Sequence, residues 1–374
     1  MHAVPFGLGP ATTALAIVNR IRAVLDKDKL EIVGLCKEPA SYVFGASAAF
    51  DVVLQFRLSD FVKEPGAWLS MMEGSDALLL VGDFLFARHL SHHSILPFFV
   101  DVISWLQMEH QLDHSKCRHV FVMRGLDGGR VVHVDQRPAN VTFVEPIWDE
   151  AIANLPNRAK EGESRTLLVN FGGILNPLGD PWPTVNAMVP LILESAAHSS
   201  QFAEIEICGG DPRLMGYTRT SGGEFVVRCG TLAHEQFLRR LACSRTILTV
   251  AGLSVVCESL AVSKTPYFVL PLNYSHLLQG KMVSTLLQLD QEISSFGIED
   301  YDSLPISLSD EIGSQAVVEL GRRFSRDASA QAAFRRRIDT ILSRASGPAA
   351  SGECWRPTGN GAGTVATCIL NELL

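Results

Sequence analysis

Residues 246–279 read TILTVAGLSVVCESLAVSKTPYFVLPLNYSHLLQ. An apolar run ends at Gly252, a helix is expected to begin near Ser254, and a second apolar strand is expected over residues 267–270. In such a unit the helix begins at the carboxyl end of the first strand, where free backbone N–H groups and the positive end of the helix dipole attract an anion. Glu258 lies about one turn into the helix, and its carboxylate can accept hydrogen bonds from sugar hydroxyls. The stretch therefore predicts a site for a nucleotide diphosphate.

This pattern resembles the donor-binding segment of GT-B-fold glycosyltransferases, in particular the bacterial UDP-N-acetylglucosamine transferase of peptidoglycan synthesis and the macrolide-type transferases. Those enzymes have a similar turn with Gly, small residues and Glu, then a Pro-x-x-x-x-Pro spacing, here Pro266 to Pro271, and a Gln-containing loop. The resemblance implies an α/β, GT-B-like fold in which two Rossmann-like domains face a central cleft. It covers residues 166–290 best and residues 1–25 less closely, whereas between about 30 and 150 only the pattern of strands is similar.

The rest of the chain is organised as this fold requires. Its 374 residues are enough for two domains. A strand, a glycine loop, a helix and a second strand open the chain, and residues 149–165 are polar, as expected of a linker. The sequence thus predicts an acceptor-side Rossmann-like domain over 1–155 and a nucleotide-sugar donor domain over 156–345. A flexible Gly/Pro-rich segment and a closing helix are expected over 346–374.

Composition narrows the class of partner and the compartment. The net charge is −8, so the chain lacks the basic excess of a general nucleic-acid binder, and the cluster Arg335-Arg336-Arg337 is expected to be a solvated helix face. The sequence has no apolar run of about 18 residues, the length expected of a membrane span, so none is predicted. The eight cysteines form no Cys-x-x-Cys pair, which favours buried free thiols. A cytoplasmic protein without stable membrane insertion is expected, and a homodimer is compatible with the sequence.

The resemblance implies a donor site assembled from several short segments of the second domain. Glycines and a helix start would hold the diphosphate, a carboxylate would bind the ribose, and polar side chains would bind the transferred sugar. The residues in these roles are Gly172 and Gly173 for the phosphate or sugar, Leu232 for the base, Gly252, Leu253 and Ser254 for the diphosphate, Glu258 for the ribose, and Asn273, His276 and Gln279 for the sugar. Each segment also has an explanation without a ligand, namely a tight turn, a capped helix or a polar loop.

The candidate catalytic residues lie in the first domain. Residues 7–15, GLGPATTAL, resemble the N-terminal loop Gly-x-Gly-His-x-x-x-Ala-Leu of the same transferases, and Gly9 is a further donor-binding candidate. The histidine of that loop is often the general base there, but this chain has Pro10 at the position. Asp83 and Asp101 each follow an apolar strand, and a strand-end carboxylate that faces a cleft is a candidate general base. For each, a helix N-cap or a solvated loop is the alternative.

A loose group of histidines does not predict a metal site, because a closed site needs ligands at defined spacing with a Cys or carboxylate partner. The members are His89, His92, His93, His110 and His114.

The predicted activity is therefore metal-independent transfer of a sugar from a nucleotide-diphosphate donor, expected to be UDP-linked, to a hydroxyl of a small metabolite. No cofactor is expected beyond the nucleotide sugar as co-substrate. Two other functions stay open: a nucleotide-sugar hydrolase or epimerase, and a catalytically silent partner subunit that binds a nucleotide sugar.

Overall fold

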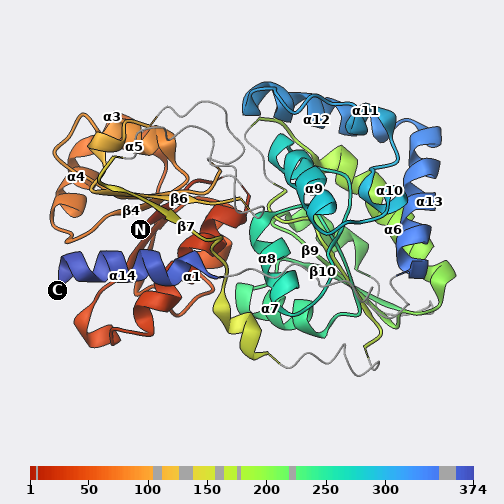
Figure 1. Ribbon diagram of the computed structural model, residues 1–374, viewed down its shortest axis with the longest axis horizontal. Coiled ribbons are helices and arrows are strands. Elements are labelled where there is room, and N and C mark those ends of the chain that lie inside the picture. The colour runs from red at the N-terminus through yellow and green to blue at the C-terminus, as the bar shows by residue number, and fades with distance from the viewer. Residues whose placement is uncertain are drawn as a thin grey trace. The chain divides into compact units, whose positions relative to one another are not determined.

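The computed structural model describes residues 1–5, 7–103, 112–125, 138–155, 164–174, 178–218, 225–344 and 359–374. The chain divides into two compact units, Met1–Glu150 with Pro357–Leu374 and Ala151–Arg356. Each contains one parallel sheet with helices (Figure 1). The predicted linker and the predicted flexible segment lie partly outside the described residues.

The first unit contains seven parallel strands. The strands are β1 (His2–Ala3), β2 (Val33–Cys36), β3 (Val52–Gln55), β4 (Leu79–Val81), β5 (Phe98–Asp101), β6 (His119–Met123) and β7 (Val141–Val144), and the helices are α1 (Gly9–Arg22), α2 (Ala40–Phe44), α3 (Leu58–Lys63), α4 (Pro65–Glu73), α5 (Phe84–Leu90) and α14 (Gly361–Leu373). Short 3-10 turns span Lys27–Lys29 and His114–Lys116, and a third, Glu150–Asn154, begins at the last residue of Met1–Glu150 and continues into the second unit. The order across the sheet is β3-β2-β1-β4-β5-β6-β7, so the direction of winding reverses between β1 and β4.

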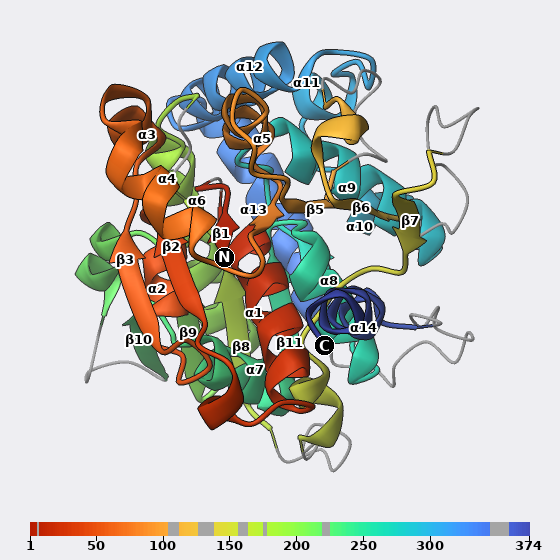
Figure 2. The same ribbon diagram turned by 90° about the vertical axis from the view of Figure 1, so that its left-hand side faces the viewer.

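Helix α1 forms because its apolar residues recur at helical spacing and Pro10 stands in its first turn, where no intrahelical N–H is needed. Leu15, Val18 and Ile21 on this repeat are buried. Helix α14, which the sequence predicts as a closing helix after a flexible segment and outside both domains, packs beside α1 (Figure 2). The first unit is thus completed by the last helix of the chain.

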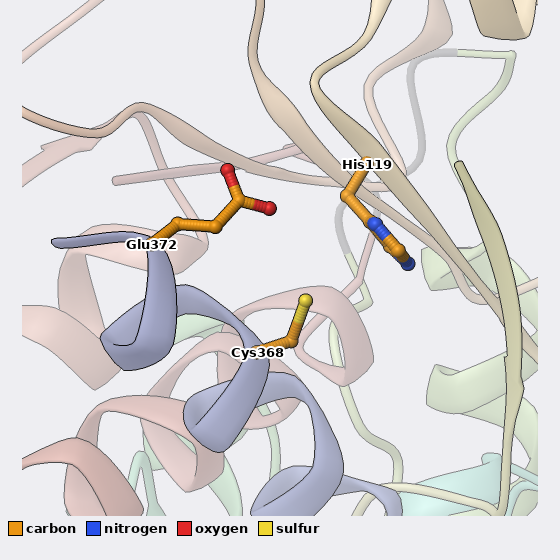
Figure 3. A group of neighbouring side chains, drawn as sticks. All are labelled: His119, Cys368 and Glu372. Atoms are coloured by element: carbon orange, nitrogen blue, oxygen red, sulfur yellow. The ribbon is translucent and has the colours of Figure 1, made fainter. Parts of the chain in front are cut away.

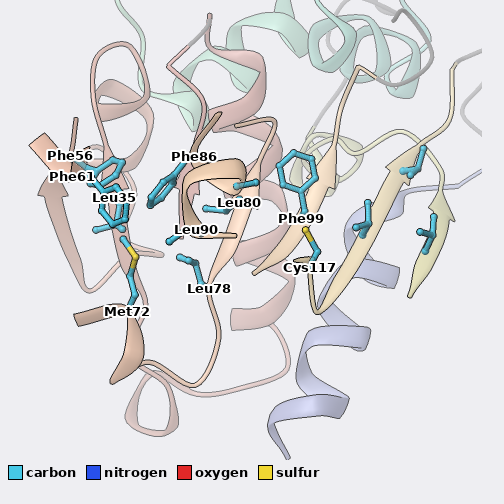
Figure 4. Packing of buried hydrophobic residues seen from close by; sticks show 14 residues of the cluster. Leu35, Phe56, Phe61, Met72, Leu78, Leu80, Phe86, Leu90, Phe99 and Cys117 are labelled. Carbon is cyan, nitrogen blue, oxygen red and sulfur yellow. The ribbon is translucent and has the colours of Figure 1, made fainter. Parts of the chain in front are cut away.

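One core cluster of the first unit combines phenylalanine rings with aliphatic side chains (Figure 4). Phe56, Phe61 and Phe86 are at most 2% exposed, and the rings of Phe56 and Phe86 lie 4.8 Å apart. Phe86 belongs to α5, so this helix is held over the sheet by the cluster. Burial of each such ring stabilises the unit by roughly 2–3 kcal/mol, which fixes the turn between β4 and α5 where Asp83 lies.

The second unit contains five parallel strands in the order β10-β9-β8-β11-β12. The strands are β8 (Thr166–Asn170), β9 (Glu204–Cys208), β10 (Val226–Gly230), β11 (Thr246–Thr249) and β12 (Tyr267–Phe268), and the helices are α6 (Trp182–Ser199), α7 (His234–Cys243), α8 (Leu253–Ala261), α9 (Tyr274–Leu286), α10 (Gln291–Ser294), α11 (Glu299–Asp302), α12 (Asp310–Phe324) and α13 (Ala328–Arg344), with a 3-10 turn at Pro212–Tyr217. Here the winding reverses between β8 and β11, whose last residues Asn170 and Thr249 are register partners.

The predicted α/β class with two parallel sheets is confirmed. The sequence did not predict strand β3, because its residues are half-exposed or exposed and do not alternate between polar and apolar. The predicted strand 267–270 is shorter in the structure and ends at Phe268. None of the described helices has the length and apolar character needed to cross a bilayer.

Two expectations about side chains have different outcomes. The cysteines in the described part of the chain are free, and Cys36, Cys208 and Cys257 are among the buried ones, as predicted. Arg337 contradicts the expectation of a solvated face, since it is 5% exposed and donates to the Ile293 carbonyl at 2.7 Å. Burial lowers the pKa of Arg337 to about 10.

Candidate functional site

The reversal point of the second sheet carries a glycine turn at the end of β8. Gly172 has φ +57°, a left-handed conformation that glycine adopts without strain. Its N–H donates to Asn170 Oδ1 at 3.0 Å, and Asn170 Nδ2 donates to Thr249 Oγ1 at 3.0 Å. Its carbonyl accepts from the Gly210 N–H at 2.8 Å. These contacts fix the Gly172-Gly173 turn beside the end of β11, at the place where ligands bind in open α/β sheets.

Helix α8 begins at the same reversal point. Gly252 is its N-cap and, as a glycine, has no side chain to accept from the first N–H groups of the helix. Leu253 and Ser254 are the first residues of the helix, and the first turn of any α-helix has backbone N–H groups without intrahelical acceptors. A helix of nine residues with this start provides the partial positive charge predicted for the diphosphate.

The end of β10 supplies Leu232, which is half-buried between Gly230 and the start of α7. The neighbouring Thr231 Oγ1 donates to the Gly209 carbonyl at 2.8 Å, which ties this segment to the end of β9. Since parallel strands end at the same edge, Leu232 lies on the edge that also carries Gly172 and Gly252.

Glu258 is 1% exposed on α8, and its Oε1 lies 3.6 Å from Nε2 of His234, which is 8% exposed. His234 is buried as the first residue of α7. The predicted ribose-binding carboxylate is therefore paired with a histidine that sequence reasoning did not connect to it.

The start of helix α9, after β12, carries the three residues that are predicted to bind the sugar. Asn273 is the N-cap of α9, and its Oδ1 accepts from the His276 N–H at 2.8 Å. His276 Nδ1 and Gln279 Oε1 are buried and have no hydrogen-bond partner among the described residues. Burial lowers the pKa of His276 to about 4, so its ring is neutral at pH 7. Buried polar groups in native proteins are nearly always paired, and a bound polar ligand at this strand end would pair them.

No family model and no curated protein matches the chain. The solved structures to which it is similar are GT-B glycosyltransferases, as the sequence resemblance predicts. UGT71G1 of Medicago truncatula complexed with UDP-glucose is 10% identical, with a TM-score of 0.47 over 100% of this chain and 98% of that chain. UGT89C1 of Arabidopsis thaliana complexed with UDP-L-rhamnose is 12% identical, with a TM-score of 0.49 over 100% and 98%. MurG of Acinetobacter baumannii is 10% identical, with a TM-score of 0.47 over 99% and 98%. At such identities and TM-scores the function has to follow from the residues of this chain.

In the first unit, Asp83 is a paired carboxylate. It is 6% exposed and is the N-cap of α5, with its Oδ1 accepting from the Phe86 N–H at 2.8 Å. Its Oδ2 lies 2.8 Å from His2 Nε2, while His2 Nδ1 lies 2.9 Å from the Leu35 carbonyl. A carbonyl only accepts, so His2 Nδ1 carries a proton and a further proton is shared between Nε2 and the carboxyl of Asp83. Sequence reasoning missed His2, because nothing local connects it to Asp83.

The other two candidates of the first unit lie on the same sheet edge. Gly9 is the first residue of α1, and a side chain added at this position would meet open space. Asp101 ends β5, is 2% exposed, and its Oδ1 accepts from the Ile103 N–H at 3.1 Å. Both strand-end carboxylates of this unit are therefore buried and hydrogen-bonded.

Of the histidine group, His110 lies outside the described residues. In the described part of the chain, His89, His92, His93 and His114 belong to no group of side chains that could hold a metal ion.

Proposed function

We propose that the chain is a glycosyltransferase that uses a nucleotide-diphosphate sugar, with UDP as the expected nucleotide. The observation that carries this proposal is the reversal point of the second sheet, where the start of α8 at Gly252 lies beside the Gly172 turn on paired strands. The backbone N–H groups of a first helical turn, the two neighbouring glycine turns and the helix dipole suit a diphosphate without a cation. The leaving diphosphate of the transfer would be stabilised by the same groups.

The neighbouring strand ends support the same ligand. Leu232 lies on the edge where a base would extend, and Glu258 lies one turn along α8 for a ribose. The buried unpaired atoms of His276 and Gln279 are suited to sugar hydroxyls, because a neutral imidazole nitrogen and an amide oxygen both accept hydrogen bonds. We propose a small hydroxylated metabolite as the acceptor and Asp83 or Asp101 as the group that takes its proton.

Substitution of Gly252 tests the diphosphate site. The nearest atom to a Cβ at this position is Val255 Cγ1 at 3.6 Å, and φ is −85°, so Gly252→Ala fits the fold. The added methyl group occupies the space through which a phosphate approaches the helix start. We expect UDP affinity, measured by calorimetry, to fall about tenfold, or roughly 1.4 kcal/mol, with an unchanged melting temperature.

The matched control is Gly66→Ala in the first turn of α4, where a Cβ also meets open space. This variant is expected to bind UDP as the wild type does. Equal UDP affinity in Gly252→Ala and Gly66→Ala would refute the proposed diphosphate site.

A second candidate function, nucleotide-sugar binding without transfer, is favoured by one observation: Asp83 and Asp101 are both buried and already hydrogen-bonded. Incubation of the protein with UDP-, GDP- and dTDP-sugars separates transfer, hydrolysis and binding alone. Transfer releases the free nucleotide diphosphate only when a hydroxylated acceptor is present. Hydrolysis releases free sugar without an acceptor, and a binding protein leaves the nucleotide sugar intact in both cases.

A further inference from the structure

Three potential metal ligands from distant parts of the sequence meet in the first unit (Figure 3). His119 is the first residue of β6, and Cys368 and Glu372 lie one turn apart on α14. One ligand atom of each side chain lies within 4.8 Å of the other two, and within the described ranges no other group of this kind exists. His119 is at the amino end of its strand, on the edge of the sheet opposite to Gly9, Asp83 and Asp101.

The chemistry of the three side chains selects the type of ion. Imidazole, thiolate and carboxylate together are ligands of Zn²⁺, whereas Ca²⁺ and Mg²⁺ prefer oxygen atoms alone. Zinc–ligand bonds of about 2.0–2.3 Å in a tetrahedron place the ligand atoms roughly 3.5 Å apart. Small rotations of the Cys368 and Glu372 side chains would bring the present atoms to that separation.

The surroundings hold the imidazole in place. His119 Nε2 lies 2.8 Å from Thr142 Oγ1, which leaves Nδ1 as the ligand atom. The His119 ring also packs against Phe121 with 4.7 Å between ring centroids. A metal-bound histidine usually donates its other ring N–H to an acceptor, and the Thr142 hydroxyl can take that role.

The helix that carries the other two ligands is anchored to the same unit. Asn360, the N-cap of α14, accepts from the Ala362 N–H at 2.9 Å and donates to the Trp148 carbonyl at 2.7 Å. On a helix, residues four apart face the same side, so Cys368 and Glu372 present their side chains together.

The carboxylate of Glu372 is the anionic member of the group, and one cation already lies beside it. The competing cation is Arg118, whose Nε lies 3.8 Å from Glu372 Oε2 with both side chains about 40% exposed. An ion pair this exposed contributes little and would be replaced by the metal.

We propose that His119 Nδ1, Cys368 Sγ and a Glu372 carboxylate oxygen bind one Zn²⁺, with water as the fourth ligand. The ion would join α14 to β6 and so stabilise the first unit. It lies on the opposite sheet edge from the predicted catalytic residues, and the metal-independent transfer proposed above does not involve it.

Cobalt substitution tests the site on the untagged full-length chain. Co²⁺ bound to a thiolate gives a sulfur-to-metal charge-transfer absorption, so metal-free protein titrated with Co²⁺ should develop this band at one equivalent, and Zn²⁺ should abolish it. Cys368→Ser should lose the band, while Glu372→Gln and His119→Asn should keep the fold and weaken Co²⁺ binding at least tenfold. Wild-type protein should also melt at a higher temperature with Zn²⁺ than without it.

Cys243→Ser is the matched control, because Cys243 is likewise a half-buried free thiol but lies in the second unit. It should retain the full band. The proposal is overturned if wild-type protein shows no thiolate band, if Cys368→Ser retains it, or if Glu372→Gln and His119→Asn bind Co²⁺ as tightly as the wild type.

Discussion

The two sheets wind in the same order through their first five strands, yet their reversal points are built differently. In the first unit the carboxylate at this point belongs to Asp83, and it is hydrogen-bonded to His2 and to the Phe86 N–H. In the second unit the N-cap of α8 is Gly252, which has no side chain, and buried polar atoms of His276 and Gln279 have no partner among the described residues. The same topology therefore yields one internally satisfied edge and one edge suited to a ligand.

Removal of His2 tests whether the first reversal point is a structural pair. His2→Ala leaves Asp83 buried without its partner, and loss of one member of a buried pair costs about 3 kcal/mol. We expect the free energy of unfolding, measured by urea denaturation, to fall by this amount while UDP affinity is unchanged. His92→Ala, at an exposed histidine, should change stability by less than about 0.5 kcal/mol.

The double variant sharpens this test. If the cost comes from an unpaired carboxylate, Asp83→Asn in the His2→Ala background should recover part of the stability, since the amide still accepts from the Phe86 N–H. A fall in UDP affinity in His2→Ala, with no loss of stability, would reverse the assignment of the two edges.

Substitution of Glu258 tests whether the second reversal point binds the 2′-hydroxyl of a ribose. If its carboxylate binds ribose, the wild type prefers UDP over 2′-deoxy-UDP, and Glu258→Gln reduces this preference about tenfold or more, since a hydrogen bond to a charged group is worth about 1.5–3 kcal/mol. Competition binding with both nucleotides gives the ratio. The alternative is a purely structural pair of Glu258 with His234. In that case Glu258→Gln lowers stability and leaves the preference for UDP unchanged.

The smallest expected effect is the dependence of stability on pH that His276 contributes. Its pKa is lowered from 6.5 to about 4 by burial, so between these pH values the unfolded chain binds more protons than the folded one. This group therefore contributes stability above pH 6.5 that is lost as the pH falls toward 4.

We expect His276→Gln to remove on the order of 1 kcal/mol of that acid sensitivity, since the residue as a whole is half-buried. Urea denaturation at pH 7 and pH 4.5 measures the difference, with His92→Gln as the control. A ligand hydroxyl that donates to His276 Nδ1 favours the neutral ring and should increase the acid sensitivity of the wild type. An unchanged pH dependence in His276→Gln would mean that this nitrogen is not buried in solution.

Prediction from sequence worked where the signal is local. The apolar run before Gly252, the start of α8 and the glycine turn after β8 all follow from neighbouring residues, and the structure has each of them. The edge strand β3 was missed because its half-exposed residues carry little periodicity. Arg337 was misplaced because its partner, the Ile293 carbonyl, comes from another helix.

The sequence by itself determined two α/β units with parallel sheets and the positions of their glycine turns, because strand periodicity and helix starts depend on residues close in the chain. Tertiary structure alone decided which polar groups at the strand ends are already paired. Asp83 meets His2, Glu258 meets His234, and His119 meets Cys368 and Glu372 only after the strands have assembled in their final order. Such contacts join residues far apart in the sequence, so no local pattern records them.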